Sequence, residues 1–180
     1  MIKGNVNIDF LTTDMLENTN YLEKNYVPDG NGLWERMGIS PPPYPIDGPV
    51  VHQTFGDQCP EWAFQIAEKF DWINHKQVTI NKIEPGCYIP PHKDTMYKIK
   101  KHLEDNNIVE ENQELIRVTI FLTDHQLGHW INIDGQSIDN YNKGDYAFIF
   151  PNQIHTVANL GFATRYTMQV TGTTDYRINV

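Results

Sequence analysis

The sequence predicts a mainly β fold with flanking helices, arranged as an antiparallel sandwich or barrel. From Gln77 onward, short β-rich runs alternate with turns at fairly even spacing, which is typical of such folds. The expected strands are Val78–Ile83, Ile116–Thr123, Trp130–Ile133, Tyr146–Phe150, Ile154–Val157 and Thr164–Val170. The turns between them are Pro85-Gly86, Asp134-Gly135, Asn142-Lys143-Gly144 and Asn159-Leu160-Gly161.

The chain before these strands is expected to form a helical and loop-rich buttress over residues 1–77. A short helix is expected over Thr13–Lys24, capped by Thr12, Thr13 or Asp14, and a Gly/Asn turn and a proline run follow at Asp29–Gly32 and Pro41–Pro45. Residues Pro60–Phe70 predict an amphipathic helix, because Trp62, Ile66 and Phe70 recur at four-residue spacing. A charged helix is also expected at Met96–Glu104. With 180 residues in all, we expect one domain whose core is residues 78–180.

Composition narrows the class of protein. The 14 Lys and Arg against 23 Asp and Glu give a net charge of −9, which disfavours proteins that wrap nucleic acid or lie on anionic lipid. No apolar run is long enough to span a bilayer, and no secretory signal is visible at the N-terminus. The 2 cysteines form no metal or disulfide framework. We therefore expect a soluble, cytoplasmic protein with reduced thiols, without nucleic-acid or membrane partners.

Two expected strands carry a polar row opposite an apolar row, because side chains alternate across a strand. Over Ile116–Thr123 the polar row includes Arg117 and Thr119, and over Thr164–Val170 it comprises Arg165, Thr167 and Gln169. Two interpretations remain open: either solvent covers the polar rows, or they line a barrel interior that binds something charged.

Three side chains are candidate metal ligands. His92 and Asp94 lie two residues apart on an extended segment, so both can reach one ion, and His155 on a facing strand can complete a face of two imidazoles and one carboxylate. Such a face leaves coordination positions open and suits non-haem Fe(II). A His-x-Asp pair alone is common by chance, but here Arg165 also follows His155 by ten residues on a strand-like segment.

The stretches IEPGCYIPPHKD and GHWINIDGQSIDNYNKGDYAFIFPNQIHTVANLGFATRYTMQV resemble the Fe(II)/2-oxoglutarate-dependent dioxygenases, over roughly Val78–Gly172. The resemblance implies a double-stranded β-helix, the jelly-roll barrel also used by cupins. It implies that His92, Asp94 and His155 hold iron and are the catalytic centre. It also implies that Arg165 binds the distal carboxylate of 2-oxoglutarate, assisted by Thr167, with Tyr88 and Arg117 as further candidates for co-substrate binding.

The resemblance implies a hydroxylase that uses Fe(II), 2-oxoglutarate and O2, with ascorbate as a possible supporting reductant. Its substrate is expected to be a small molecule or a peptide, in the manner of prolyl or aspartyl/asparaginyl hydroxylases. Oxidative nucleic-acid demethylases usually carry a second Arg six residues after the first, where this chain has Thr171. The alternatives are a cupin-like metalloprotein that does not use 2-oxoglutarate and a non-catalytic jelly-roll ligand domain.

Four other features have both a structural and a functional interpretation. His125 and His129 form an HxxxH pair that we read as a strand-end loop, with a position at the mouth of the site as the alternative. Trp130 and Asn132 are read as packing and turn residues, with substrate contact as the alternative. The tryptophans Trp34, Trp62 and Trp72 are expected in the core, and Tyr44 is a candidate lid residue.

Overall fold

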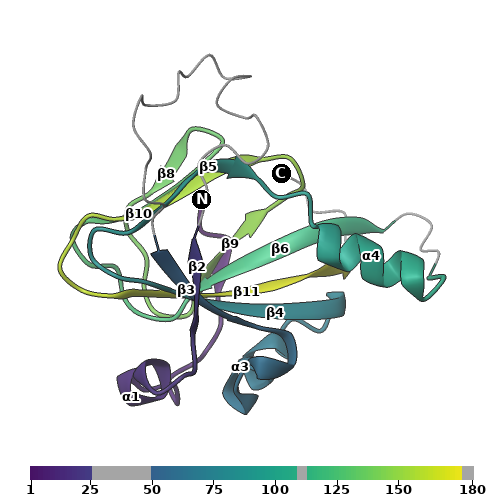
Figure 1. Ribbon diagram of the computed structural model, residues 1–180, viewed down its shortest axis with the longest axis horizontal. Coiled ribbons are helices and arrows are strands. Elements are labelled where there is room, and N and C mark those ends of the chain that lie inside the picture. The colour runs from purple at the N-terminus through teal and green to yellow at the C-terminus, as the bar shows by residue number, and fades with distance from the viewer. Residues whose placement is uncertain (26–49, 109–112, 176–180) are drawn as a thin grey trace.

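The computed structural model describes residues 1–25, 50–108 and 113–175, drawn in colour in Figure 1. The helices are α1 (Thr13–Glu17), α3 (Glu61–Ala67) and α4 (Tyr97–Asp105), with a 3-10 turn at Gly56–Gln58. The strands are β1 (Gly4–Asn5), β2 (Leu22–Asn25), β3 (Val50–Phe55), β4 (Asn74–Ile83), β5 (Tyr88–Lys93), β6 (Glu114–Phe121), β7 (His129–Ile133), β8 (Gln136–Ile138), β9 (Asp145–Ile149), β10 (Ile154–Asn159) and β11 (Arg165–Thr174).

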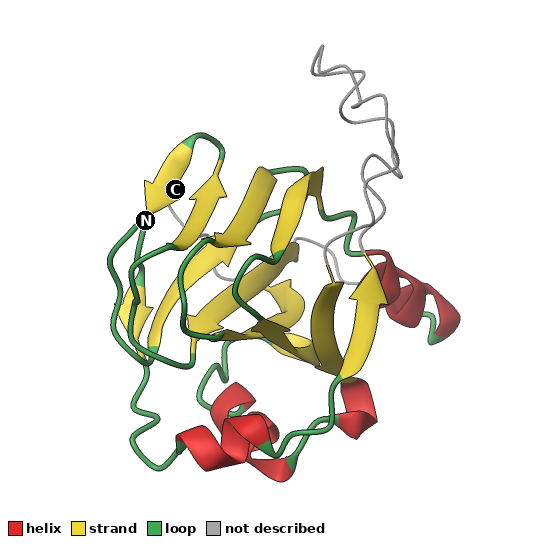
Figure 2. Cartoon of the chain, turned by 60° about the vertical axis from the view of Figure 1, so that its left-hand side comes forward, coloured by secondary structure: helices red, strands yellow, loops and turns green. Residues whose placement is uncertain are grey.

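The strands form two antiparallel sheets that face each other (Figure 2). The larger sheet has the order β1-β9-β6-β11-β4-β3-β2, and the smaller sheet has the order β5-β10-β7-β8. From β4 to β11 the chain passes repeatedly between the two sheets, so that β4, β6, β9 and β11 lie in one and β5, β7, β8 and β10 in the other. This order is the double-stranded β-helix of a jelly roll, and it confirms the predicted fold class.

The outer face of the larger sheet is apolar and packs against helices. In Figure 1, α1 and α3 lie below this sheet while α4 lies at its side. One buried cluster joins Leu16 of α1 and Ile66 of α3 to Ile80, Val118 and Met168 of the sheet. Val118 and Met168 belong to the apolar rows predicted from the sequence, so the opposite, polar rows of β6 and β11 face the barrel interior.

Helix α3 confirms the predicted amphipathic helix, although Pro60 occupies the N-cap position and Ala67 is the last helical residue. Helix α4 confirms the expected charged helix. Helix α1 is shorter than predicted, because Asn18 ends it and residues 22–25 form strand β2 instead. Thr12 is its N-cap, and its hydroxyl accepts a hydrogen bond from the amide of Met15 at 3.3 Å.

The N-terminal part of the chain contributes more than a buttress, since β1, β2 and β3 all join the larger sheet. Trp62 is buried and Trp72 is half-buried against the same cluster, as expected of core residues. Both cysteines are free. No helix among the described residues is long and apolar enough to cross a membrane. The expected turn at 29–32, the proline run at 41–45, Trp34 and Tyr44 lie outside the described residues.

Candidate metal centre

A cavity of about 470 Å³ lies between the two sheets. Its walls come from the inner faces of β3, β4, β6, β9 and β11 on one side and from β5, β7 and β10 on the other, with Lys98 contributed by α4. The polar row residues Arg117, Thr119, Arg165, Thr167 and Gln169 all line it. Of the two interpretations left open by the sequence, the polar barrel interior is therefore the one that the structure has.

His92, Asp94 and His155 converge at this cavity. His92 and His155 are directly opposite partners on the antiparallel strands β5 and β10, and Asp94 follows the end of β5. One ligand atom from each of the three residues lies within 4.8 Å of the others. The Asp94 carboxylate is 3.2 Å from Nε2 of His155 and 3.9 Å from Nε2 of His92. The structure thus brings together the three residues that the sequence placed as metal ligands.

The backbone orients both imidazoles. Nδ1 of His92 lies 2.8 Å from the carbonyl oxygen of Pro90, and Nδ1 of His155 lies 3.1 Å from that of Gln153. A carbonyl oxygen only accepts, so each Nδ1 carries the hydrogen and each neutral ring keeps its lone pair on Nε2, toward Asp94. Burial lowers the pKa of His155 to about 4, so this ring is neutral at pH 7. Two neutral imidazoles and a carboxylate fit a divalent transition metal such as Fe(II) or Zn(II).

A bulge in β5 decides which side chains of this strand face the cavity. His92 pairs with His155 and Ile89 pairs with Val157, so three residues on β5 span two on β10. The extra residue lies at Pro90-Pro91, which β5 tolerates because it is an edge strand. As a result Ile89 and His92 both line the cavity, whereas Tyr88 does not. The structure therefore does not bring Tyr88 to the position expected of a co-substrate residue.

Arg165 begins β11 and is only 1% exposed. Its Nε donates to the hydroxyl of Tyr141 at 3.3 Å, and its guanidinium carbon lies 5.7 Å from the centre of the Phe121 ring. Its Nη2 is buried without a hydrogen-bond partner. Within the described part of the chain, no carboxylate forms an ion pair with it. Burial lowers the pKa of Arg165, but a guanidinium stays charged in proteins.

The other two residues expected at the co-substrate lie at different places in the cavity. Thr167 is buried and lines the wall two residues after Arg165 on the same face of β11. Arg117 instead reaches the metal-ligand cluster, where its Nη1 pairs with the Asp94 carboxylate while its Nε donates to Thr171 at 3.0 Å. Arg117 thus contacts a candidate metal ligand rather than the surroundings of Arg165.

The HxxxH pair lies away from the cavity. His129 is buried at the start of β7, and Nε2 of His125, in the preceding turn, lies 3.0 Å from the carbonyl of His129. Neither imidazole lines the cavity. Trp130 and Asn132 serve the β7–β8 hairpin as expected, because both side chains donate to the Ser137 hydroxyl, at 3.0 and 3.1 Å.

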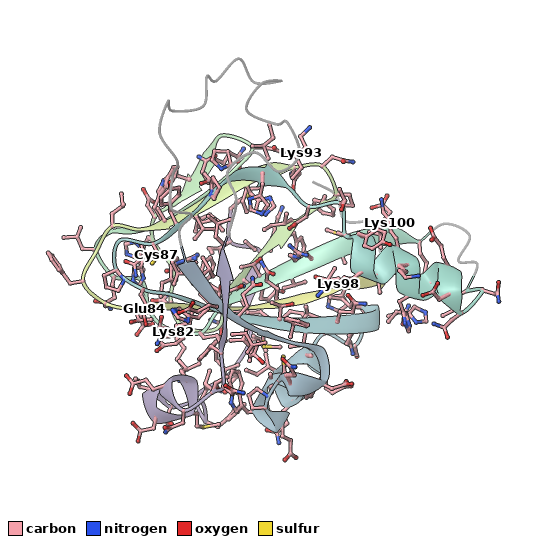
Figure 3. The ribbon with its side chains drawn as sticks, in the orientation of Figure 1. Lys82, Glu84, Cys87, Lys93, Lys98 and Lys100 are labelled. Atoms are coloured by element: carbon pink, nitrogen blue, oxygen red, sulfur yellow. The ribbon has the colours of Figure 1, made fainter. Side chains whose placement is uncertain are left out.

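Sequence reasoning missed several residues of the site. Lys98 reaches the cavity from the barrel side of α4 (Figure 3), and its ammonium lies 3.9 Å from the centre of the Phe55 ring. Tyr141, the partner of Arg165, follows β8 in a segment without a periodic pattern. Thr119 was placed on a polar row but assigned no role, and its buried hydroxyl has no partner. Alternation along β6 was the one signal that pointed to Thr119.

The charge of the cavity is opposite in sign to that of the chain. Lys98, Arg117 and Arg165 line it, and Asp94 is the one carboxylate among the described lining residues. Any metal held by the cluster adds further positive charge. The cavity therefore suits a negatively charged ligand, although the whole chain carries a net charge of −9.

No family model and no curated protein matches the sequence. Among solved structures, the chain is similar to a predicted oxalate decarboxylase from Thermotoga maritima, with 12% identity, a TM-score of 0.45 and coverage of 87% of this chain and 94% of that one. It is also similar to a putative sugar phosphate isomerase from Acidithiobacillus ferrooxidans, with 12% identity, a TM-score of 0.44 and coverage of 90% and 73%.

A third similar structure is a cupin protein from Bacteroides fragilis, with 15% identity, a TM-score of 0.39 and coverage of 58% and 70%. The fold assignment rests on the strand order described above. No activity follows from similarity at this level.

Proposed function

We propose that the chain is an oxygenase that uses Fe(II) and 2-oxoglutarate to hydroxylate a C–H bond. The observation that carries this proposal is Arg165, a buried cation with an unpartnered Nη2 in the same cavity as the candidate metal ligands. A buried charge without a counterion is destabilising, so such a residue is best explained by an anion that binds there. A guanidinium is well suited to a carboxylate, which it can bind through two parallel hydrogen bonds.

A ligand with two acidic ends matches the two ends of the cavity. The neutral Nε2 atoms of His92 and His155 and the carboxylate of Asp94 would hold the metal at one end. Arg165, with Thr167 beside it, would bind the distal carboxylate at the other. The excess of cations along the walls favours a dianion such as 2-oxoglutarate over a neutral ligand.

When bound, Fe(II) would supply the coordination and redox chemistry that couples oxidative decarboxylation of 2-oxoglutarate to attack on the substrate. In the balanced reaction, substrate, O2 and 2-oxoglutarate give hydroxylated substrate, succinate and carbon dioxide. The chain's own residues position the reactants and exclude water. Ile89, Ile131 and Val157 form an apolar wall on the smaller sheet, where bulk water would otherwise compete. Ascorbate is expected to support turnover by keeping the iron reduced.

We propose a small molecule or a peptide side chain as the substrate. A cavity of about 470 Å³ is of the size that proteins use for small ligands, and it admits a side chain more readily than a folded partner. Strand β11 has Thr171 six residues after Arg165, where oxidative nucleic-acid demethylases usually carry a second Arg, which argues against a nucleic-acid substrate. A cytoplasmic location without membrane or nucleic-acid partners remains part of this proposal.

A second candidate is a cupin-like metalloenzyme that does not use 2-oxoglutarate. The surplus of cations favours it equally, because Arg165 and the metal would also accept a different organic anion. Such an enzyme would retain His92, Asp94 and His155 and would bind its own carboxylate substrate at Arg165.

Calorimetric titration of 2-oxoglutarate into the Fe(II)-loaded protein under anaerobic conditions separates the two candidates, and succinate formation in air tests the reaction. The oxygenase predicts stoichiometric binding that Arg165→Ala abolishes and Lys101→Ala leaves intact, because Lys101 pairs with Asp105 on the outside of α4. Wild-type protein that holds one metal but does not bind 2-oxoglutarate would exclude the oxygenase and leave the second candidate.

A further inference from the structure

The hydroxyl of Tyr141 joins Arg165 to a second buried side chain. It lies 3.3 Å from Nε of Arg165 and 3.2 Å from Nδ1 of His129. The other nitrogen of His129, Nε2, lies 2.9 Å from the carbonyl oxygen of Ala163. Tyr141 and His129 are each nearly inaccessible to solvent, so water does not substitute for these contacts.

Chemistry fixes the direction of each hydrogen bond in this chain. The Ala163 carbonyl only accepts, so Nε2 of His129 carries its hydrogen, and in the neutral ring Nδ1 then accepts. Burial lowers the pKa of His129, which keeps the ring neutral at pH 7. Tyr141 therefore donates its hydrogen to His129 and turns a lone pair toward Arg165, whose Nε–H only donates.

Packing holds the two rings of this arrangement in place. Tyr141 stacks on Phe121 with a centroid distance of 3.8 Å and an interplanar angle of 15°. The Arg165 guanidinium lies over the other partner of that stack, 5.7 Å from the centre of the Phe121 ring. Nε of the guanidinium thus donates to Tyr141, and among the described residues Nη2 has no partner. Neither Tyr141 nor His129 lines the cavity, so both act on a bound ligand only through Arg165.

We propose that Tyr141 and His129 are positioning residues that hold the Arg165 guanidinium in the orientation needed to bind the distal carboxylate of 2-oxoglutarate. This inference rests on the proposed function. Without the Tyr141 hydroxyl, Nε of Arg165 would have no acceptor among the described residues, and the guanidinium would rotate between ligand and wall. A charged hydrogen bond is strong only when its geometry is held, so the distal carboxylate would bind more weakly.

The test compares two ligands that differ only at the end that Arg165 would bind. 2-Oxoglutarate carries the distal carboxylate, whereas 2-oxopentanoate has a methyl group in its place. Dissociation constants of both are measured by calorimetry on anaerobic Fe(II)-loaded protein. Tyr141→Phe keeps the ring that stacks on Phe121. We expect this variant to raise the dissociation constant of 2-oxoglutarate about tenfold and to change that of 2-oxopentanoate less than about twofold.

Tyr21→Phe is the matched control, because the Tyr21 hydroxyl donates to the Leu16 carbonyl at 3.0 Å, away from the cavity. It should leave both dissociation constants unchanged. His129→Gln should weaken the binding of 2-oxoglutarate severalfold in the wild-type background. In the Tyr141→Phe background it should cause no further loss of affinity, because its effect passes through Tyr141. This variant also serves as the test if Tyr141→Phe does not fold.

Equal weakening of both ligands by Tyr141→Phe, or no weakening, would overturn the positioning role, as would additive losses in the double variant. The proposed function fails in a different way: wild-type protein would then hold the metal but not bind 2-oxoglutarate. The two failures are therefore distinguishable in the same set of titrations.

Discussion

The two ends of the cavity differ in how far the protein's own side chains balance the buried charges there. At the end with the candidate metal ligands, Asp94 pairs with Arg117 and lies beside two imidazoles that the backbone orients. At the other end, Arg165 is a buried cation whose one hydrogen-bond acceptor among the described residues is the phenolic oxygen of Tyr141. At the first end the carboxylate already has a counter-charge from Arg117, whereas the cation at the second end has none among the described residues and needs an anion. This difference indicates where binding free energy for an acidic ligand is concentrated.

Removing Asp94 should have the largest effect, which is the loss of metal binding at the first end of the cavity. Asp94→Ala takes away the one carboxylate of the cluster, which is also the carboxylate that pairs with Arg117. We expect Fe(II) affinity to fall more than about 100-fold, since changes in outer-shell residues alone cost 10–100-fold. Metal content after anaerobic reconstitution and desalting measures this. Asp105→Ala on α4 is the control, and equal metal content in both variants would contradict the assignment of Asp94.

Replacing Arg165 should weaken ligand binding at the second end of the cavity without lowering the folding stability of the ligand-free protein. Arg165→Met removes the site for the distal carboxylate, so 2-oxoglutarate affinity should fall about 100-fold, as expected for a lost bidentate pair worth about 3 kcal/mol. Burying a charge that has no counterion is costly, so the apolar side chain should leave the free energy of unfolding of the ligand-free protein unchanged or raise it.

Urea denaturation of the ligand-free protein measures this second effect. A loss of several kcal/mol in the free energy of unfolding would mean that Arg165 already has its full set of partners without a ligand. The comparison between the two ends of the cavity would then be wrong.

His129, which contacts Arg165 through Tyr141, should contribute to the change of folding stability with pH. Burial places the pKa of His129 in the folded chain below the ordinary value of 6.5. The unfolded chain therefore binds more protons as the pH falls through 6.5, and the free energy of unfolding decreases. His129→Gln should remove part of this decrease in metal-free protein. Urea midpoints at pH 7.5 and pH 5 measure it, and parallel decreases in variant and wild type would contradict the prediction.

The smallest expected effect concerns Lys98 at the mouth of the cavity. Lys98→Gln should slow association of 2-oxoglutarate about two- to threefold at low ionic strength, and salt should screen the difference. Lys100→Gln is a matched control, because Lys100 lies two residues away on the same helix without lining the cavity (Figure 3). Stopped-flow binding kinetics measure both variants. Identical association rates for the two variants would contradict a role of Lys98 in attracting the ligand to the cavity.

The parts of the fold that the sequence predicted are those with a strong period. Alternation in β6 and β11 separated the row that packs on α3 from the row that lines the cavity, and spacing together with a family resemblance identified His92, Asp94 and His155. Strands β1 and β2 were missed because they are short edge strands with polar residues. Strand β3 was missed within the loop-rich N-terminal segment.

The remaining differences come from contacts that no local pattern encodes. The bulge at Pro90-Pro91 reverses which side chains of β5 face inward, and it excludes Tyr88 from the cavity. The contact between Tyr141 and Arg165 joins residues 24 positions apart in the sequence. Arg117 was expected on the polar face, but its pairing with Asp94 depends on how the two sheets are placed relative to each other.

The two faces of strand β11 have different roles: one packs against the helices and the other lines the cavity. Tyr166, Met168 and Val170 anchor it to the helices, while Arg165, Thr167 and Gln169 contact the cavity. Mutational libraries confined to positions 167 and 169 should therefore explore new ligand preferences with little risk of misfolding. This strand makes the barrel a convenient starting scaffold for engineering ligand binding.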